Sequence, residues 1–359
     1  MRVSGAGSYV PGGARPAEGA MDGHLRIGAC LSLSGKFARF GRQAARGLQA
    51  WRSLDGTTDI LVKDDHSDRR TLEAVLPDLA ARCDILLGPY STQLMRAAGR
   101  MAADSDWLIW NHGGSGDDVE GAHPGHVVSV LTPASRYAEP FLLRLAREPG
   151  RPRDLCLVHG PGSFGRQVAD GAEAMARNLG IRTMRATPDD QIPPPGMSAE
   201  WDLFSAGVFE QDAEMVGKAL RWPTPPRRVC AVAAGVREFS HAVEDPEGVF
   251  GVAQWFPGRK SEVALGPSED DFLGAYADPR GRWPDYPAAQ AAAGAMIAAH
   301  CVRLVDGTSR DGLWEAAASL ATSTLFGGFK IDPGSGAQIE HQTVLVRWAD
   351  GELLPAAAG

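Results

Sequence analysis

The feature that most constrains this chain is a regular alternation of short apolar runs with longer amphipathic segments. From Leu25 onward, the runs LRIGACL, DILVKDD, DILLGPY and DWLIWNH are separated by segments with helical periodicity at about 39–54, 68–82 and 92–104. Short apolar runs separated by helices of this length are typical of βαβ units whose parallel sheet is buried on both faces. We therefore expect an α/β fold with a doubly wound sheet.

The same alternation begins again near HVVSV and predicts a second α/β unit. Its apolar runs are DLCLVHG, IRTMRA, a strand near 202–208, VCAVAAG and GVFGVAQ, and helices are expected near 135–147, 164–180, 212–221, 268–277, 286–305 and 310–321. The closing sequences FGGFKID and HQTVLVRWADG, on either side of a DPGSG turn, predict a β-hairpin. A length of 359 residues fits two lobes with a core each.

Composition narrows the function classes. Apolar residues make up 44% and charged residues 22%, as in soluble globular proteins. The net charge of −8 argues against a general nucleic-acid or anionic-membrane binder, which needs a basic face. No run of 18 apolar residues occurs, so no membrane insertion is expected.

The N-terminus and the cysteines bear on location. Residues 1–24 contain no apolar run typical of a secretory leader, so we expect a flexible tail and a cytoplasmic protein. A periplasmic or cell-surface location follows instead if a leader is missing from this sequence. Five single cysteines without a CxxC motif predict buried, reduced thiols.

One motif is typical of nucleotide binding. Gly160-x-Gly162-x-x-Gly165 follows a strand and opens a helix, as a dinucleotide-binding turn does. The next strand, IRTMRA, ends without the acid that would bind the ribose. We therefore interpret the motif as a glycine-rich turn and expect no cofactor.

Metal and nucleophile motifs are incomplete. His123-x-x-His126 and the Asp64 to His66 run lack further ligands at a suitable spacing. Ser115 is followed two residues later by Asp117, so it misses the G-x-S-x-G pattern. No metal site is expected.

The ends of two neighbouring strands carry the clearest site signal. DILLGP leads into Ser91 and Thr92 directly before a helix, and WLIWN leads into Gly113 and Gly114. Ligands of open α/β sheets bind at the carboxyl ends of strands, and free N–H groups at a helix N-terminus attract a carboxylate. A helix cap and a turn glycine also explain each loop taken alone.

Several stretches in order carry a family resemblance: IGACLSLSGKFARFGRQAARGLQAW, ILLGPYSTQLMRAAGRMAADSDWLIWNHGGSGDDV, HGPGSFGRQVADGAEAMARNLGI, YPAAQAAAGAMIAA and FGGFKIDPGSGAQIEHQTVLVRW. With them the chain resembles the type I periplasmic-binding-protein fold, in the branch of branched-chain amino acid and amide-binding proteins of ABC transporters. The resemblance implies two doubly wound lobes that close on a small ligand, joined by three crossovers near 131–135, 253–257 and 324–330.

The resemblance also implies lobe boundaries and site residues. The N-terminal lobe comprises 25–132 and 256–325, the C-terminal lobe 133–255 and 326–352, and tails cover 1–24 and 353–359. The ligand-binding residues implied are Ser34, Phe37, Ser91, Thr92, Trp110, Gly113, Gly114, Ser115, Phe164, Phe209, Glu210 and Trp255. Of these, Ser91 and Thr92 match the loop that binds the ligand carboxylate.

Departures from the family pattern point to the kind of ligand. Phe164 lacks the hydroxyl of the usual tyrosine, and VCAVAAG ends without an acid to pair with an ammonium, Glu238 coming only after the next turn. We therefore expect an aromatic or larger amino-acid-like ligand, stacked on Phe164, Trp110 or Trp255. Core packing is the other interpretation of the two tryptophans.

Two functions remain open at this point. The first is a small-molecule-binding protein, either the solute receptor of an ABC permease or a cytoplasmic sensor that acts on a regulator by lobe closure. The second is a cytoplasmic enzyme that catalyses a cofactor-free condensation or cyclisation, with Glu210, His112 or Asp117 transferring protons.

Overall fold

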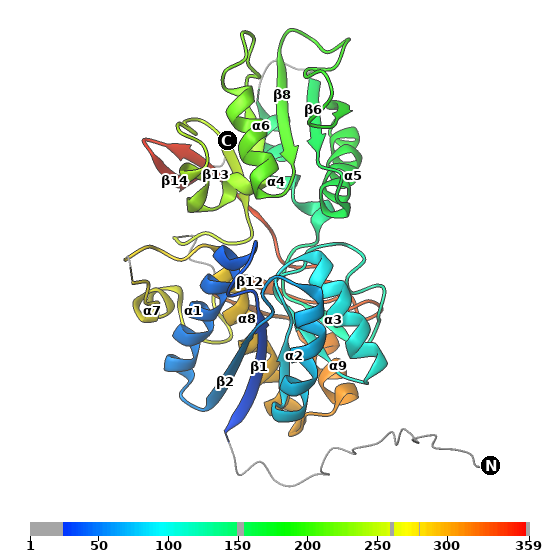
Figure 1. The fold of residues 1–359 in the computed structure, drawn as a ribbon, viewed down its shortest axis with the longest axis vertical. Coiled ribbons are helices and arrows are strands. Elements are labelled where there is room, and N and C mark those ends of the chain that lie inside the picture. Colours follow the sequence, from blue (N-terminus) through cyan, green and yellow to red (C-terminus); the bar gives the residue numbers. More distant parts are fainter. Residues whose placement is uncertain (1–23, 149–153, 259–261, 280, 357–359) are drawn as a thin grey trace, which may run out of the picture.

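In a computed structural model the chain forms two α/β lobes stacked along the long axis of the molecule (Figure 1). The structure describes residues 24–148, 154–258, 262–279 and 281–356. The expected tail at 1–24 therefore lies, apart from its last residue, outside the described residues. The two lobes and their doubly wound sheets confirm the expected fold class.

The N-terminal lobe is built on a parallel sheet with strand order β2-β1-β3-β4-β5. Its strands are β1 (Leu25–Leu31), β2 (Thr58–Asp64), β3 (Ile85–Leu87), β4 (Ile109–Asn111) and β5 (Val127–Ser129). Helices α1 (Ala38–Asp55) and α8 (Tyr286–Val305) pack on one face, and α2 (Arg69–Arg82) and α3 (Thr92–Asp104) on the other. Helices α7 (Glu269–Ala275) and α9 (Arg310–Ser319) complete the lobe.

Helix α8 is the central helix of this lobe. Gly47 of α1 lets the two backbones meet, because a Cβ there would lie 2.1 Å from the carbonyl oxygen of Ala288. Helix α8 is also long and apolar enough to cross a membrane, but 78% of its most apolar window is buried inside the protein. Its composition therefore reflects its place between the sheet and α1.

The C-terminal lobe is built on a seven-stranded sheet with strand order β14-β13-β10-β9-β8-β6-β7. The strands are β6 (Asp154–His159), β7 (Arg182–Ala186), β8 (Trp201–Ala206), β9 (Val229–Ala231), β10 (Phe250–Ala253), β13 (Val344–Ala349) and β14 (Glu352–Pro355), the last two antiparallel. Helices α4 (Glu139–Arg147) and α5 (Ser163–Asn178) cover one face, and α6 (Phe209–Ala219) the other. Short 3-10 helices are η1 (Ala134–Arg136), η2 (Val232–Gly235) and η3 (Arg237–His241).

The prediction of a C-terminal β-hairpin is wrong. Strand β12 (Gly327–Phe329) pairs with β11 (Thr322–Thr324), whereas β13 pairs with β10 and β14 in the other lobe. The DPGSG turn does form, closed by a bridge between Ile331 and Gln338, but the chain then leaves the lobe. Turn and strand signals are local, so they do not reveal which sheet a strand joins.

Two expected boundaries also differ in the structure. Phe326, Phe329 and Ile331 are buried in the core of the N-terminal lobe, so the third crossover follows 331 and does not fall at 324–330. Residue 353, where the C-terminal tail was expected to begin, lies within β14, and its side chain is buried against the second lobe. Residues 357–359 lie outside the described residues. All five cysteines are buried and free, as expected.

Candidate ligand-binding cleft

A cavity of about 240 Å³ lies between the two lobes, where the carboxyl ends of both sheets face each other. A cavity of this volume is far larger than the space that one water molecule needs, and it suits a small organic ligand. Its lining comes from both lobes and comprises Lys36, Phe37, Phe40, Tyr90, Ser91, Thr92, Gln93, Gly113, Ser115, Leu131, Tyr137, Gly162, Ser163, Phe164, Gly207, Val208, Phe209, Val232, Ala233, Val236, Tyr286 and Gln290.

One side of the cavity is the N-terminus of α3. Ser91 has a φ of 94°, an unusual backbone conformation for a residue other than glycine, and its Oγ accepts a hydrogen bond of 3.4 Å from the amide of Leu94. The amides of Thr92 and Gln93 have no acceptor among the described residues. Free amides at a helix N-terminus favour an anionic group such as a carboxylate.

A buried hydrogen-bond network fixes the neighbouring loop. Oδ1 of Asn111 accepts from the amides of Gly113 (3.1 Å) and Gly114 (2.8 Å). Its Nδ2 donates to Oε1 of Glu120 at 2.9 Å, and the Ser129 hydroxyl donates to the same carboxyl group. Burial raises the pKa of Glu120 to about 7. The network holds Gly113 against Tyr90, where a Cβ would lie 2.7 Å from the Tyr90 Cα.

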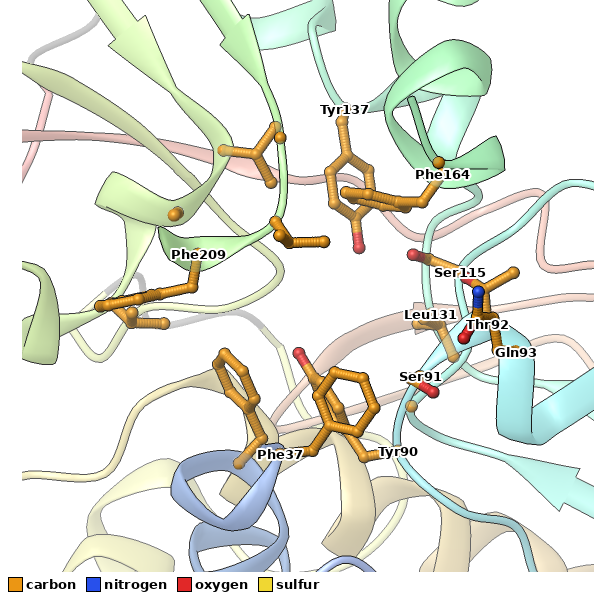
Figure 2. Close-up of a pocket in the computed structure, with 18 of the residues that line it drawn as sticks. Phe37, Tyr90, Ser91, Thr92, Gln93, Ser115, Leu131, Tyr137, Phe164 and Phe209 are labelled. Atoms are coloured by element: carbon orange, nitrogen blue, oxygen red, sulfur yellow. The ribbon is translucent and has the colours of Figure 1, made fainter. Parts of the chain in front are cut away.

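Aromatic rings from both lobes form most of the remaining walls (Figure 2). The ring of Tyr90 stacks on Phe40 with centroids 4.4 Å apart, and Tyr137 meets Phe164 edge-on at 5.6 Å. Figure 2 shows the rings of Phe37, Tyr90, Tyr137, Phe164 and Phe209 around a shared space, with Ser91, Thr92 and Ser115 to one side of it. An aromatic ligand would pack well between such rings.

The tyrosine hydroxyls of the cleft are neutral donors and acceptors. The hydroxyls of Tyr90 and Tyr286 lie 3.0 Å apart in a hydrogen bond, and the Tyr137 hydroxyl accepts from Nε2 of Gln254 at 2.8 Å. Burial raises the pKa of all three tyrosines. They therefore remain protonated at physiological pH.

The charged part of the cavity lining is positive. Lys36 is its one charged residue, and no aspartate or glutamate occurs among the described residues that line the cavity. The Nζ of Lys36 lies 4.8 Å from the centroid of the Phe37 ring. The described lining thus offers one positive charge and no carboxylate to pair with a cationic group.

Polar contacts join the lobes on both sides of the cavity. On one side Arg39 of α1 forms an ion pair of 2.8 Å with Glu210 of α6 and packs over the ring of Phe209. On the other side, Arg96 of α3 donates to the hydroxyl of Ser163 at 2.9 Å. These contacts join the two lobes across the cavity.

Seven of the expected site residues line the cavity, namely Phe37, Ser91, Thr92, Gly113, Ser115, Phe164 and Phe209. Five do not, namely Ser34, Trp110, Gly114, Glu210 and Trp255. Both tryptophans are buried in the core of the N-terminal lobe, as the core-packing interpretation had it. Trp110 lies within β4, and the ring of Trp255 meets that of Phe272 in α7 edge-on at 6.5 Å.

The other three residues contact neighbours outside the cavity. The hydroxyl of Ser34, in the loop after β1, donates to Asp64 at the end of β2 at 2.8 Å. Gly114 faces Met95, whose Cβ would lie 2.5 Å from an added Cβ. Glu210 pairs with Arg39 across the rim, with 68% of its side chain exposed.

The three groups suggested for an enzyme do not converge on the cavity. His112 is completely buried, and burial lowers its pKa to about 4, so the ring is neutral. The Asp117 carboxylate accepts from the amide of Ser135 at 3.0 Å, and Glu210 lies at the rim. None of the three lines the cavity.

The glycine-rich turn at Gly160 to Gly165 brings α5 close to β8. A Cβ on Gly165 would lie 2.3 Å from the carbonyl oxygen of Ala206, so the glycine allows this close approach.

Sequence reasoning missed several lining residues. Tyr90 directly precedes Ser91 in the same strand-end loop, so the position of that loop could have identified it. Tyr137 follows the first crossover, and Tyr286 and Gln290 lie one turn apart on α8. No local pattern distinguishes these three from core residues.

Comparisons with known proteins agree with this geometry. The family model described as periplasmic binding protein matches residues 24–202. A leucine-binding protein from Thermotoga maritima has 15% identity and a TM-score of 0.76, covering 93% of this chain and 98% of that chain. A branched-chain amino acid transporter substrate-binding protein from Streptococcus pneumoniae, in complex with isoleucine, has 12% identity and a TM-score of 0.74 over 92% of this chain and 97% of that chain.

A third similar structure holds a different ligand. It is a solute-binding protein of an ABC transporter from Rhodopseudomonas palustris in complex with 3,4-dihydroxybenzoic acid. Its identity is 14% and its TM-score 0.74, covering 92% of this chain and 95% of that chain. The family's description refers to the periplasm and gives no support to a cytoplasmic location. The family match shows that residues 24–202 belong to the periplasmic binding protein family, and the similarity over both lobes shows that the chain has the type I fold of that family.

Proposed function

We propose that this chain is a solute-binding protein that closes its two lobes on a small aromatic carboxylic acid. The observation that carries the proposal is the lining of the cavity. It combines aromatic rings from both lobes, free amides at the N-terminus of α3 and a single lysine, without an acidic residue among its described members.

The carboxylate is the part of the ligand that α3 would bind. Amides of Thr92 and Gln93 are free to donate to it, and the hydroxyl of Ser91 lies beside them. Lys36 adds a positive charge in the same cavity. Charge-assisted hydrogen bonds of this kind are among the strongest that a binding site offers.

The rest of the ligand would be aromatic and without an ammonium group. An ammonium enclosed here would have no carboxylate partner in the described lining, and a buried unpaired charge is costly. The structure with 3,4-dihydroxybenzoic acid demonstrates that a protein of this fold holds such an acid. These points favour an aromatic acid over leucine or isoleucine.

We propose an ABC permease as the partner, with a regulator as the alternative. Closure fixes the two lobes relative to each other through Arg39–Glu210 and Arg96–Ser163. A partner that contacts both lobes would distinguish the closed form from an open one.

Thermal unfolding with a ligand panel tests the proposal. Because a ligand that binds only the folded state stabilises it, an aromatic acid at a hundredfold excess over its Kd should add about 2.7 kcal/mol to the free energy of unfolding. Leucine at the same concentration should add much less, and the acid should be recovered chemically unchanged. Stabilisation by leucine alone would contradict the ligand class, and a converted acid would contradict a purely binding role.

A further inference from the structure

The side chain of Gln290 is a polar group in the cavity that the proposed function does not yet use. Gln290 is 1% exposed and lines the cavity, and its Oε1 has no hydrogen-bond partner within the described parts of the chain. Buried side-chain amides are normally hydrogen-bonded. An amide oxygen without a hydrogen-bond partner in a ligand cavity therefore indicates that the ligand supplies the missing hydrogen bond.

The position of Gln290 on α8 directs it to the cleft. Tyr286 lies one turn before it and lines the same cavity. Gly294 lies one turn after it, close to Leu87 of β3 and to His112 beyond β4. This face of α8 therefore runs across the ends of the two strands whose loops form the carboxylate side of the site.

The composition of α8 does not explain why position 290 carries an amide side chain. Helix α8 is rich in alanine and buried, and its other buried residues include no second amide. An apolar side chain here would avoid the free-energy cost of an unpaired buried oxygen. A ligand that supplies a hydrogen bond removes that cost on binding.

We propose that Gln290 binds a hydroxyl group on the ligand and so selects hydroxylated aromatic acids over unsubstituted ones. The inference rests on the proposed function. A hydroxyl donates to Oε1 and also accepts from Nε2, so it satisfies the amide in either orientation. An ammonium would also donate, but the described lining provides no acid to neutralise it.

Titration of the wild-type protein with benzoate, 3-hydroxybenzoate and 4-hydroxybenzoate tests the inference together with the variant Gln290→Met. The wild type should bind one hydroxybenzoate about tenfold more tightly than benzoate, because one hydrogen bond to a buried group is worth about that factor. Gln290→Met has a similar length but no amide. It should reduce the ratio of the hydroxybenzoate affinity to the benzoate affinity to about one.

The outcomes separate this inference from the proposed function. Equal wild-type affinity for benzoate and both hydroxybenzoates overturns the role of Gln290 and leaves an aromatic-acid receptor in place. Failure of all three acids to bind overturns the proposed function itself. An unchanged preference in Gln290→Met also overturns the inference. Gln290→Leu serves as the second variant, and each should unfold at or above the wild-type temperature because it removes an unpaired buried group.

Discussion

Replacement of Gly113 by alanine is expected to lower the affinity for the aromatic acid by about 100-fold or more. The added Cβ would lie 2.7 Å from the Cα of Tyr90 and 2.8 Å from the carbonyl oxygen of Pro89. Backbone cannot give way as a flexible side chain does, so the two strand-end loops must separate. Ser91 and Tyr90 then move in the site, and displacements near 1 Å are enough for a loss of this size.

Gly121→Ala is the matched control. Gly121 lies in the turn after the same loop, and an added Cβ would meet nothing within 4 Å. It should bind the acid as the wild type does and unfold at the same temperature, whereas Gly113→Ala should lose about 1–3 kcal/mol of stability through overpacking. Calorimetric titration and thermal unfolding of both variants measure the two effects. Wild-type affinity in Gly113→Ala would show that the loop packing does not shape the site.

Gln93→Glu is expected to weaken binding of the acid by about 10- to 100-fold while leaving the fold intact. Gln93 lines the cavity in the first turn of α3. The new carboxylate has the same size as the amide and interacts favourably with the helix N-terminus, so stability should not fall. It repels the carboxylate of the ligand, and the loss should shrink at high salt.

The control for this charge effect is Gln93→Met, which removes the amide without adding charge. Its affinity for the acid should remain within about threefold of the wild type, because the backbone amide of residue 93 is retained. Titrations at low and high ionic strength distinguish the variants. Equal losses in Gln93→Glu and Gln93→Met, independent of salt, would contradict a carboxylate at the N-terminus of α3.

Local signals in the sequence were sufficient to predict the helices and the strand-end loops. The bounds of α3 and α8 were predicted to the residue, because periodicity and a serine cap or a proline-containing first turn mark these helices. The loop at Ser91 and the loop at Gly113 were placed together because neighbouring parallel strands end at one edge.

Features that depend on long-range packing could not be predicted in this way. The sheet that β13 joins depends on β10, whose Phe250 pairs with Arg347 almost a hundred residues later in the chain. The resemblance implied Trp110 as a ligand contact, and no local pattern pointed to Gln290. The tryptophan lies in the core of the N-terminal lobe and the glutamine lines the cavity, and both places depend on how distant segments pack.

The most direct test of the central claim is a calorimetric titration that compares 4-hydroxybenzoate with its neutral primary amide, 4-hydroxybenzamide. The two share the ring and the hydroxyl and differ only in the group that the N-terminus of α3 would bind. The account predicts that the acid binds at least about tenfold more tightly, because only the acid has the negative charge that the free amides and Lys36 favour. Equal or tighter binding of the amide would contradict it.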